Sequence, residues 1–181
     1  PSQEPAQDDS SFIIENGVLV RCTATSGTVT IPDGVTAIGN GEGRVFERGV
    51  LKVVLPDSVR TINEDAFWDS TVQEVNIPSG VTEIGMRAFL ECDYLKHITI
   101  PNSVTKIGEQ AFQNCTSLTS VTLPNTLTAV EAYAFCGCSA LTSVTIPASV
   151  REIGDNAFSG CSLTSVTLPK GLKKLGTAAF S

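Results

Sequence analysis

The sequence is poor in the residues from which most enzyme sites are built. Its 181 residues include one His, one Trp and two Tyr, and only 17% of them are charged. A globular surface usually carries about 25% charged residues, so much of the polar surface must come from uncharged side chains, chiefly Ser and Thr. With a single His, no Ser-His-Asp or Cys-His arrangement can be supported from the sequence. This scarcity ranks an enzyme last among the functions considered for the chain.

Basic residues and long apolar runs are also scarce. Twelve Lys and Arg against 19 Asp and Glu give a formal net charge of −7. This balance disfavours nucleic acid as a partner, because phosphate binding needs clustered basic side chains. No apolar run approaches the roughly 18 residues of a membrane span, so no transmembrane segment is expected. The 41% of hydrophobic residues still allow a core and exclude disorder along the whole chain.

The first eleven residues differ in composition from the rest. They are polar, with two prolines and acidic residues, and they lack the basic and apolar regions of a signal peptide. Residues 1–11 are therefore predicted to form a flexible polar tether. Such a start suits a mature secreted or lipid-anchored protein, and it suits a trimmed chain equally well.

Proline and phenylalanine recur along the rest of the chain at one common spacing. Successive prolines are 22 to 24 residues apart and successive phenylalanines 21 to 23. The repeated positions are Pro32, Pro56, Pro78, Pro101, Pro124, Pro147 and Pro169, and Phe46, Phe67, Phe89, Phe112, Phe135, Phe158 and Phe180. Two residue types that share a period near 23 indicate a repeat architecture, which takes precedence over any local secondary-structure assignment.

Each repeat divides into three segments. The first, such as residues 118–123, alternates apolar residues with Ser and Thr and ends at a proline, which predicts a short strand. The second, such as residues 104–108, predicts a turn with room for a second short strand. The third, such as residues 109–112, predicts about one helical turn that anchors the repeat through its Ala and Phe.

One such repeat cannot bury its own apolar face, so neighbouring repeats must stack on one another. We therefore expect an α/β, mostly β, right-handed solenoid of about seven repeats, with parallel strands on one face and little helix. The repeats start near residues 26, 50, 72, 95, 118, 141 and 163, so that the solenoid spans 26–181. Residues 12–25 are expected to form a β-hairpin cap, because Asn16-Gly17 between two apolar runs is a strong hairpin signal.

The repeat resembles the BspA-type leucine-rich repeat. The residues that carry the resemblance follow the frame L-x-x-V-x-I/L-P-x-S-V-x-x-I-G-x-x-A-F-x-x-C, which fits well from Val50 to Phe180. The fit is weaker from Ser26 to Gly49, where Gly41-Glu42-Gly43 distorts the third segment, and residues 12–22 resemble the family's N-terminal cap. The resemblance implies a secreted or cell-surface protein that adheres to host proteins, without a shared catalytic residue.

Cysteine and tryptophan are two further residue types that can form a site. Four cysteines occupy one repeat position: Cys92, Cys115, Cys138 and Cys161. We expect them to be free, buried thiols, since free Cys is among the most buried residue types. The cysteine spacing and the single His support no metal site, and no cofactor is expected. Trp68 replaces the small polar residue that usually follows the Phe, and it is either an edge packing residue or an exposed contact residue.

The outward positions of the first segments form the most informative surface. One column of equivalent positions reads Lys52, Glu74, His97, Ser120, Ser143 and Ser165, and the next reads Val54, Asn76, Thr99, Thr122, Thr145 and Thr167. The C-terminal half is a uniform Ser/Thr surface, whereas the N-terminal half is varied and charged. Varied and charged side chains can discriminate between partners. The candidate partner-binding residues are therefore Lys52, Glu74, Asn76, Lys96 and His97.

Two functional hypotheses are preferred over an enzymatic function. The preferred one is a non-enzymatic surface or secreted module, expected as a monomer, that binds a host or extracellular-matrix protein or a glycan through the strand-lined face. The alternative is a structural spacer within a larger surface protein, without a ligand of its own.

Overall fold

An antiparallel hairpin opens the described part of the chain. The structure is a computed structural model that describes residues 11–181, so all but the last residue of the predicted tether lies outside the described residues. Strand β1 (Phe12–Glu15) pairs with β2 (Val18–Cys22) through the turn Asn16-Gly17, whose φ angles are 52° and 80°. Positive φ at both central residues is what a tight type I′ turn requires. Strand β2 then pairs in parallel with the first repeat, so the hairpin covers the edge of the stack, as the sequence predicts.

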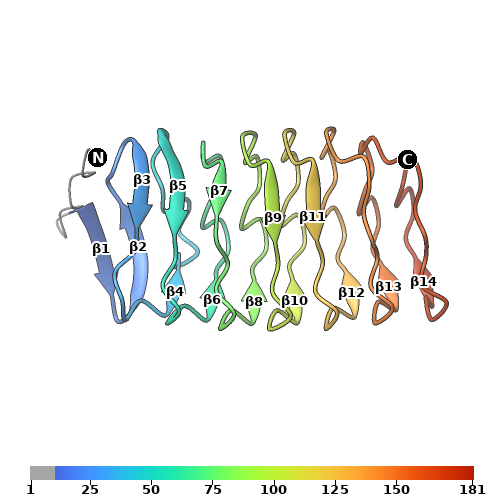
Figure 1. Cartoon of the computed structure of the whole chain (residues 1–181), viewed down its shortest axis with the longest axis horizontal. Helices are drawn as coiled ribbons and strands as arrows, with labels where there is room; N and C mark the ends of the chain where they lie inside the picture. The colour runs from blue at the N-terminus through green and yellow to red at the C-terminus, as the bar shows by residue number, and fades with distance from the viewer. Residues whose placement is uncertain (1–10) are drawn as a thin grey trace, which may run out of the picture.

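The repeats stack side by side into an elongated solenoid behind this hairpin (Figure 1). Five strands belong to the predicted first segments: β3 (Gly27–Thr30), β5 (Val50–Val54), β7 (Glu74–Val75), β9 (His97–Thr99) and β11 (Ser120–Thr122). We call the surface formed by their outward side chains, together with residues 143–145 and 165–167, the strand-lined face. Apolar side chains alternate inward with outward Ser, Thr or charged side chains, as in the exposed–buried–exposed pattern of β11. Leu51 of β5 is an exception, because it is an exposed apolar side chain. The predicted solenoid with parallel strands is confirmed.

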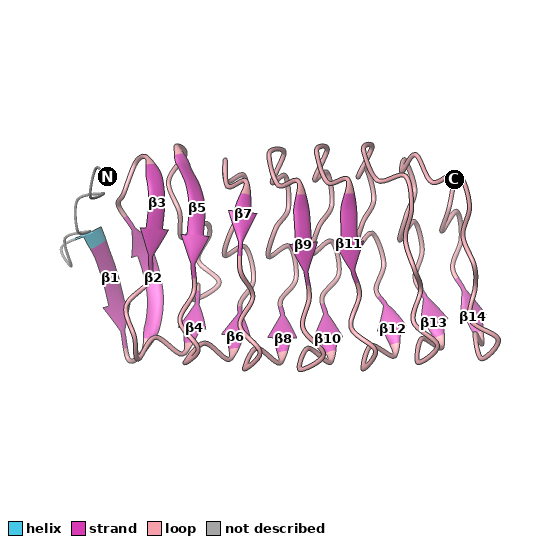
Figure 2. Ribbon diagram, viewed as in Figure 1, coloured by secondary structure: helices cyan, strands magenta, loops and turns pink. Residues whose placement is uncertain are grey.

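A second row of short parallel strands runs along another side of the solenoid (Figure 2). It comprises β4 (Ala37–Ile38), β6 (Thr61–Ile62), β8 (Glu83–Ile84), β10 (Lys106–Ile107), β12 (Ala129–Val130), β13 (Glu152–Ile153) and β14 (Lys174–Leu175). The sequence left room for these strands but did not require them. Most of them contribute one buried apolar side chain, such as Ile84 or Ile107, whereas Leu175 of β14 is exposed. Except for β12, each strand pairs in parallel with the preceding coil or, for β4, with the hairpin.

The third segment of the repeat is not helical, and this part of the expectation is wrong. The residue before each Ala-Phe pair and the residue two positions after the Phe take positive φ, for example 58° at Asp65 and 52° at Asp69. A right-handed helix cannot contain these conformations. Every second N–H therefore points along the solenoid axis, as where Phe67 donates to the Ala88 carbonyl at 2.7 Å. We call this side of the molecule the turn face.

The core consists of columns of identical residues. The seven phenylalanine rings form a continuous stack with centroid separations from 4.6 to 5.3 Å. Cysteines form a second column, in which each thiol donates to the Phe carbonyl of the preceding repeat, as Cys115 does to Phe89 at 3.1 Å. All six cysteines are free, and Cys92, Cys115 and Cys138 are fully buried. These columns confirm that neighbouring repeats build the core together.

Candidate functional site

The strand-lined face carries a groove of about 480 Å³ between the third and fourth repeats. Four of the five candidate residues line it: Glu74, Asn76, Lys96 and His97. The apolar part of the lining comes from Val75, Ile77 and Pro101. Lys52, the fifth candidate, lies outside the lining but joins it through an ion pair with Glu74.

The groove lies at one of the places where the strand ladder is interrupted. Strand β7 pairs with β5, and β9 pairs with β11, but β7 and β9 belong to separate sheets. Within residues 11–181, no backbone hydrogen bond joins residues 73–77 to residues 96–100. The interruption leaves room between two strands that are neighbours in the stack, and the groove occupies this place.

Asn76 has a structural task that its place in the outward column does not reveal. In two other repeats the residue after the strand donates to a backbone carbonyl of the next repeat, as Ile31 does to Val54 and Ile100 to Thr122. Leu55 instead donates to Oδ1 of Asn76 at 2.8 Å, and Nδ2 of Asn76 donates to the Leu55 carbonyl at 3.0 Å. The side-chain amide thus takes the place of the ladder bonds at the end of β5. It is exposed, yet both of its polar atoms already have partners.

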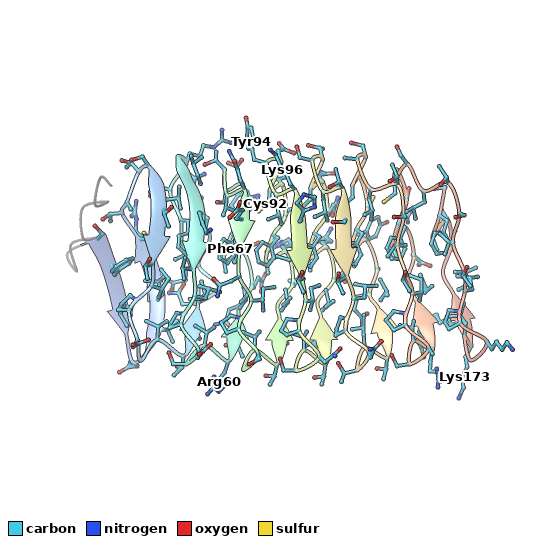
Figure 3. All side chains as sticks on the ribbon, viewed as in Figure 1. Arg60, Phe67, Cys92, Tyr94, Lys96 and Lys173 are labelled. Carbon is cyan, nitrogen blue, oxygen red and sulfur yellow. The ribbon has the colours of Figure 1, made fainter. Side chains whose placement is uncertain are left out.

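The charged residues of the groove are unequally partnered. Nζ of Lys52 lies 2.9 Å from a carboxylate oxygen of Glu74, and both side chains are at least half exposed. An ion pair of this exposure contributes little to stability. Lys96 is exposed at the upper end of the coils (Figure 3) and has no ion-pair partner in the described part of the chain. The rim therefore offers one ammonium group that is free to meet an acceptor.

His97 is held toward the next repeat by two hydroxyl groups. Its Nδ1 lies 2.8 Å from Oγ of Ser120 and 3.2 Å from Oγ1 of Thr119. The register pairs His97 directly with Ser120, as the repeat spacing predicts. These contacts fix the ring on an exposed strand, where it can present its other nitrogen to a partner.

The thiols do not form a reactive site. Burial raises the pKa of the Cys115 thiol well above its ordinary value, and the neighbouring Cys115 thiol raises the pKa of Cys138. A thiol with a raised pKa stays protonated at neutral pH and is a poor nucleophile. Among residues 11–181, no group of three or more His, Cys, Asp or Glu side chains is placed to hold a metal ion.

The sequence predicts four residues that line the groove, but it does not predict the groove itself. The apolar lining residues Val75, Ile77 and Pro101 were not singled out, because inward and strand-ending residues look alike in every repeat. The one available signal was Asn76, an amide in a column that otherwise holds Val or Thr. The sequence predicts Asn76 as a contact residue, whereas in the structure its side-chain amide pairs with the backbone of Leu55.

Stacked coils of 22 to 24 residues, with parallel strands on one side and a phenylalanine column inside, define a leucine-rich-repeat solenoid. Comparison with protein families specifies the class further. The chain matches the BspA type leucine-rich repeat region, in six copies, over residues 12–141 and 60–181. It belongs to this family.

Solved structures of bacterial repeat proteins are similar to the chain. A leucine rich cell surface protein from Faecalibacterium prausnitzii is 33% identical with a TM-score of 0.84, over 99% of this chain and 52% of that one. A leucine-rich repeat protein from Bacteroides ovatus is 31% identical with a TM-score of 0.77, over 88% and 41% of the two chains. The chain thus spans about half the length of these relatives or less. A search of curated proteins found no match.

No helix within residues 11–181 combines the length and apolar character needed to cross a membrane.

Proposed function

We propose that the chain is a non-enzymatic binding module that recognises a protein or a glycan through its strand-lined face. The observation that carries the proposal is the groove between β7 and β9, which brings Glu74, Lys96 and His97 together on a rigid repeat scaffold. Leucine-rich repeats of this type form a fold that generally serves protein interaction, which supports a macromolecular partner.

The size and chemistry of the groove suit a single side chain or sugar unit by which such a partner is anchored. Its volume of about 480 Å³ is within the usual range of ligand pockets. Lys96 supplies a cation for a carboxylate or carbonyl oxygen, and Val75 and Ile77 supply apolar contact. The net charge of −7 favours a basic or neutral partner over an acidic one.

The proposal includes a location on the cell surface or outside the cell. Family membership supports this location, and so does the similarity to a protein described as a leucine rich cell surface protein. Host or extracellular-matrix proteins and glycans are the partner classes that such a location provides.

A screen against immobilised extracellular-matrix proteins and glycans tests the proposal. For any partner found, the variant Lys52→Ala/Glu74→Ala/His97→Ala should bind at least about tenfold more weakly. Its melting temperature should be unchanged, because all three side chains are exposed.

A matched control changes the same face in its uniform half, with Ser143→Ala/Thr145→Ala/Ser165→Ala. This control should bind like the unmodified protein. Undiminished affinity in the first variant, together with loss from changes on the turn face near Glu109 or Asp155, would place the site on the other side of the solenoid.

The alternative of a structural spacer has its own support. In the C-terminal half, the outward side chains of the strand-lined face are Ser and Thr throughout and carry no charge. If the chain is a spacer, no immobilised protein or glycan in the screen should retain the unmodified protein more strongly than it retains the triple variant of the groove.

A further inference from the structure

We propose that the turn face carries a second binding site, a cleft near the hairpin that takes a neutral saccharide. The cleft has a volume of about 520 Å³, and Trp68, Arg44, Glu47, Asn40, Glu42 and Arg21 contribute to its lining. None of these residues lines the groove on the strand-lined face. The second site is therefore independent of the proposed function.

The cleft is formed where the first repeat departs from the regular pattern. Gly39 and Phe46 are seven positions apart, whereas the equivalent Gly108 and Phe112 are four apart, so this segment of the first repeat is three residues longer. The inserted loop contains Gly41 and Gly43 with φ angles of 83° and 115°. Glycine tolerates such angles. The loop forms part of the cleft wall beside the hairpin.

Trp68 forms the aromatic wall. It occupies the same repeat position as Glu47, one coil further along, and 41% of its surface is exposed. Its indole Nε1 donates to a carboxylate oxygen of Glu91 at 3.3 Å, on the coil beyond. This bond holds one edge of the ring while the side chain lines the cleft. An orienting bond reduces the rotamer freedom that an exposed side chain would lose on binding.

The polar side chains of the cleft are already held in a network. Nδ2 of Asn40 donates to Glu42 at 3.0 Å, and the Glu42 backbone N–H donates to Oδ1 of Asn40 at 3.1 Å. Arg21 donates to Glu47 at 2.7 Å. Arg44 lies 3.8 Å from Glu47 and donates to Asp69 at 3.1 Å. The donors and acceptors are thus positioned before any ligand arrives.

This combination of groups matches a neutral saccharide. Two arginines and two glutamates in the lining balance each other in charge, so neither an anion nor a cation is favoured. Each sugar hydroxyl can donate and accept a hydrogen bond. The carboxylates of the cleft can accept these bonds, the guanidinium groups can donate them, and the Asn40 amide can do both. The apolar C–H face of a sugar ring stacks on an indole, which is apolar across its face. A peptide would need more apolar anchorage than Val20 and Trp68 supply.

Trp68 is the only tryptophan in the chain, so tryptophan emission, excited selectively over that of the two tyrosines, reports on this cleft alone. The protein is titrated with cellohexaose, laminarihexaose, mannohexaose and maltohexaose, and calorimetry measures binding in parallel. At least one oligosaccharide should shift the Trp68 emission and protect it from acrylamide quenching, with a dissociation constant of about 1 mM or tighter. No emission change and no heat of binding with any of the four would overturn the proposal.

Variants then locate the binding. Trp68→Ala should abolish the calorimetric signal, and Asn40→Ala/Glu42→Ala, which alters only exposed side chains, should weaken binding at least about fivefold. Tyr94→Ala removes an aromatic side chain that is 55% exposed and does not line the cleft, and it should bind normally. The triple variant of the strand-lined face should also bind normally, which separates this site from the proposed function. Unchanged affinity in both cleft variants would refute the assignment.

Discussion

Truncation of one ring in the phenylalanine stack tests how the solenoid is stabilised. Phe112 is fully buried, and its ring centroid lies 5.0 Å from that of Phe89 and 5.2 Å from that of Phe135. Phe112→Ala therefore removes a buried side chain and two stacked contacts at once. Phe180→Ala makes the same chemical change in the last coil, where the ring is partly exposed and has a single stacked neighbour in the described chain, Phe158.

The two variants should lose different amounts of unfolding free energy. Replacement of a buried Phe by Ala costs about 3–5 kcal/mol of unfolding free energy, and each aromatic pair contributes about 0.5–1.5 kcal/mol beyond area burial. With two ring neighbours and no exposure, Phe112→Ala belongs near the upper end, at about 4–5 kcal/mol. Phe180→Ala loses one ring contact and less burial, so we expect about 2 kcal/mol.

Urea denaturation followed by far-ultraviolet circular dichroism measures both losses. Emission from Trp68 provides a second probe close to the hairpin, and agreement of the two probes checks that the repeats unfold together. A loss below about 1 kcal/mol for Phe112→Ala would mean that the ring is not a core element. Equal losses in the two variants would mean that contacts between neighbouring repeats do not set the stability.

Four further predictions concern individual side chains and the buried thiols. Asn76→Ala should lower the unfolding free energy by about 1–2 kcal/mol, because it removes both side-chain bonds to Leu55; thermal melting measures this, and Lys96→Ala should leave stability unchanged. Arg87→Leu should cost about 2 kcal/mol, since it leaves the nearly buried Asp65 without its two bonds of 2.9 Å; Arg87→Lys should restore only part of it in denaturant melts. In native protein at pH 8, iodoacetamide should modify Cys136 before the fully buried thiols, as peptide mass spectrometry would show. The pKa of the buried thiols is raised in the folded protein, so above about pH 9 only the unfolded chain releases these protons. The unfolding free energy should therefore be at its full value below this pH and should fall above it.

The stacked core could be read from the sequence because it depends on periodicity. Phe, Cys and the strand residues recur at fixed intervals, and a repeat that cannot bury its own apolar face must stack on a neighbour. The register of His97 with Ser120 follows from the same period, and the structure confirms it. Where one residue type occupies one position in successive repeats, its surroundings are copied as well.

The backbone of the third segment could not be read in the same way. A short stretch such as Glu109-Gln110-Ala111-Phe112 fits a helical turn by composition. The choice of positive φ at Gln110 depends on hydrogen bonds to the next repeat, such as that from Gln110 to the Ala132 carbonyl. Such bonds exist only in the stack and leave no local signal.

The two candidate sites could be predicted from the sequence to different degrees. The charged column through Lys52, Glu74 and His97 was visible because it departs from a uniform Ser/Thr background. The groove between β7 and β9 was not visible, because the sequence carries no local signal for where two neighbouring strands fail to pair. On the turn face, the extra glycines and Trp68 were each noticed as irregular, but only the fold brings them to one cleft.

Hydrogen exchange on a complex tests the proposed function most directly. A partner recovered from the screen is added in excess, and amide exchange is compared across residues 11–181 with and without it. We predict that protection on binding concentrates in residues 73–77 and 96–101, which form the groove on the strand-lined face. Protection confined to the turns around residues 109–114 and 155–160, with residues 73–77 and 96–101 unchanged, would contradict the account.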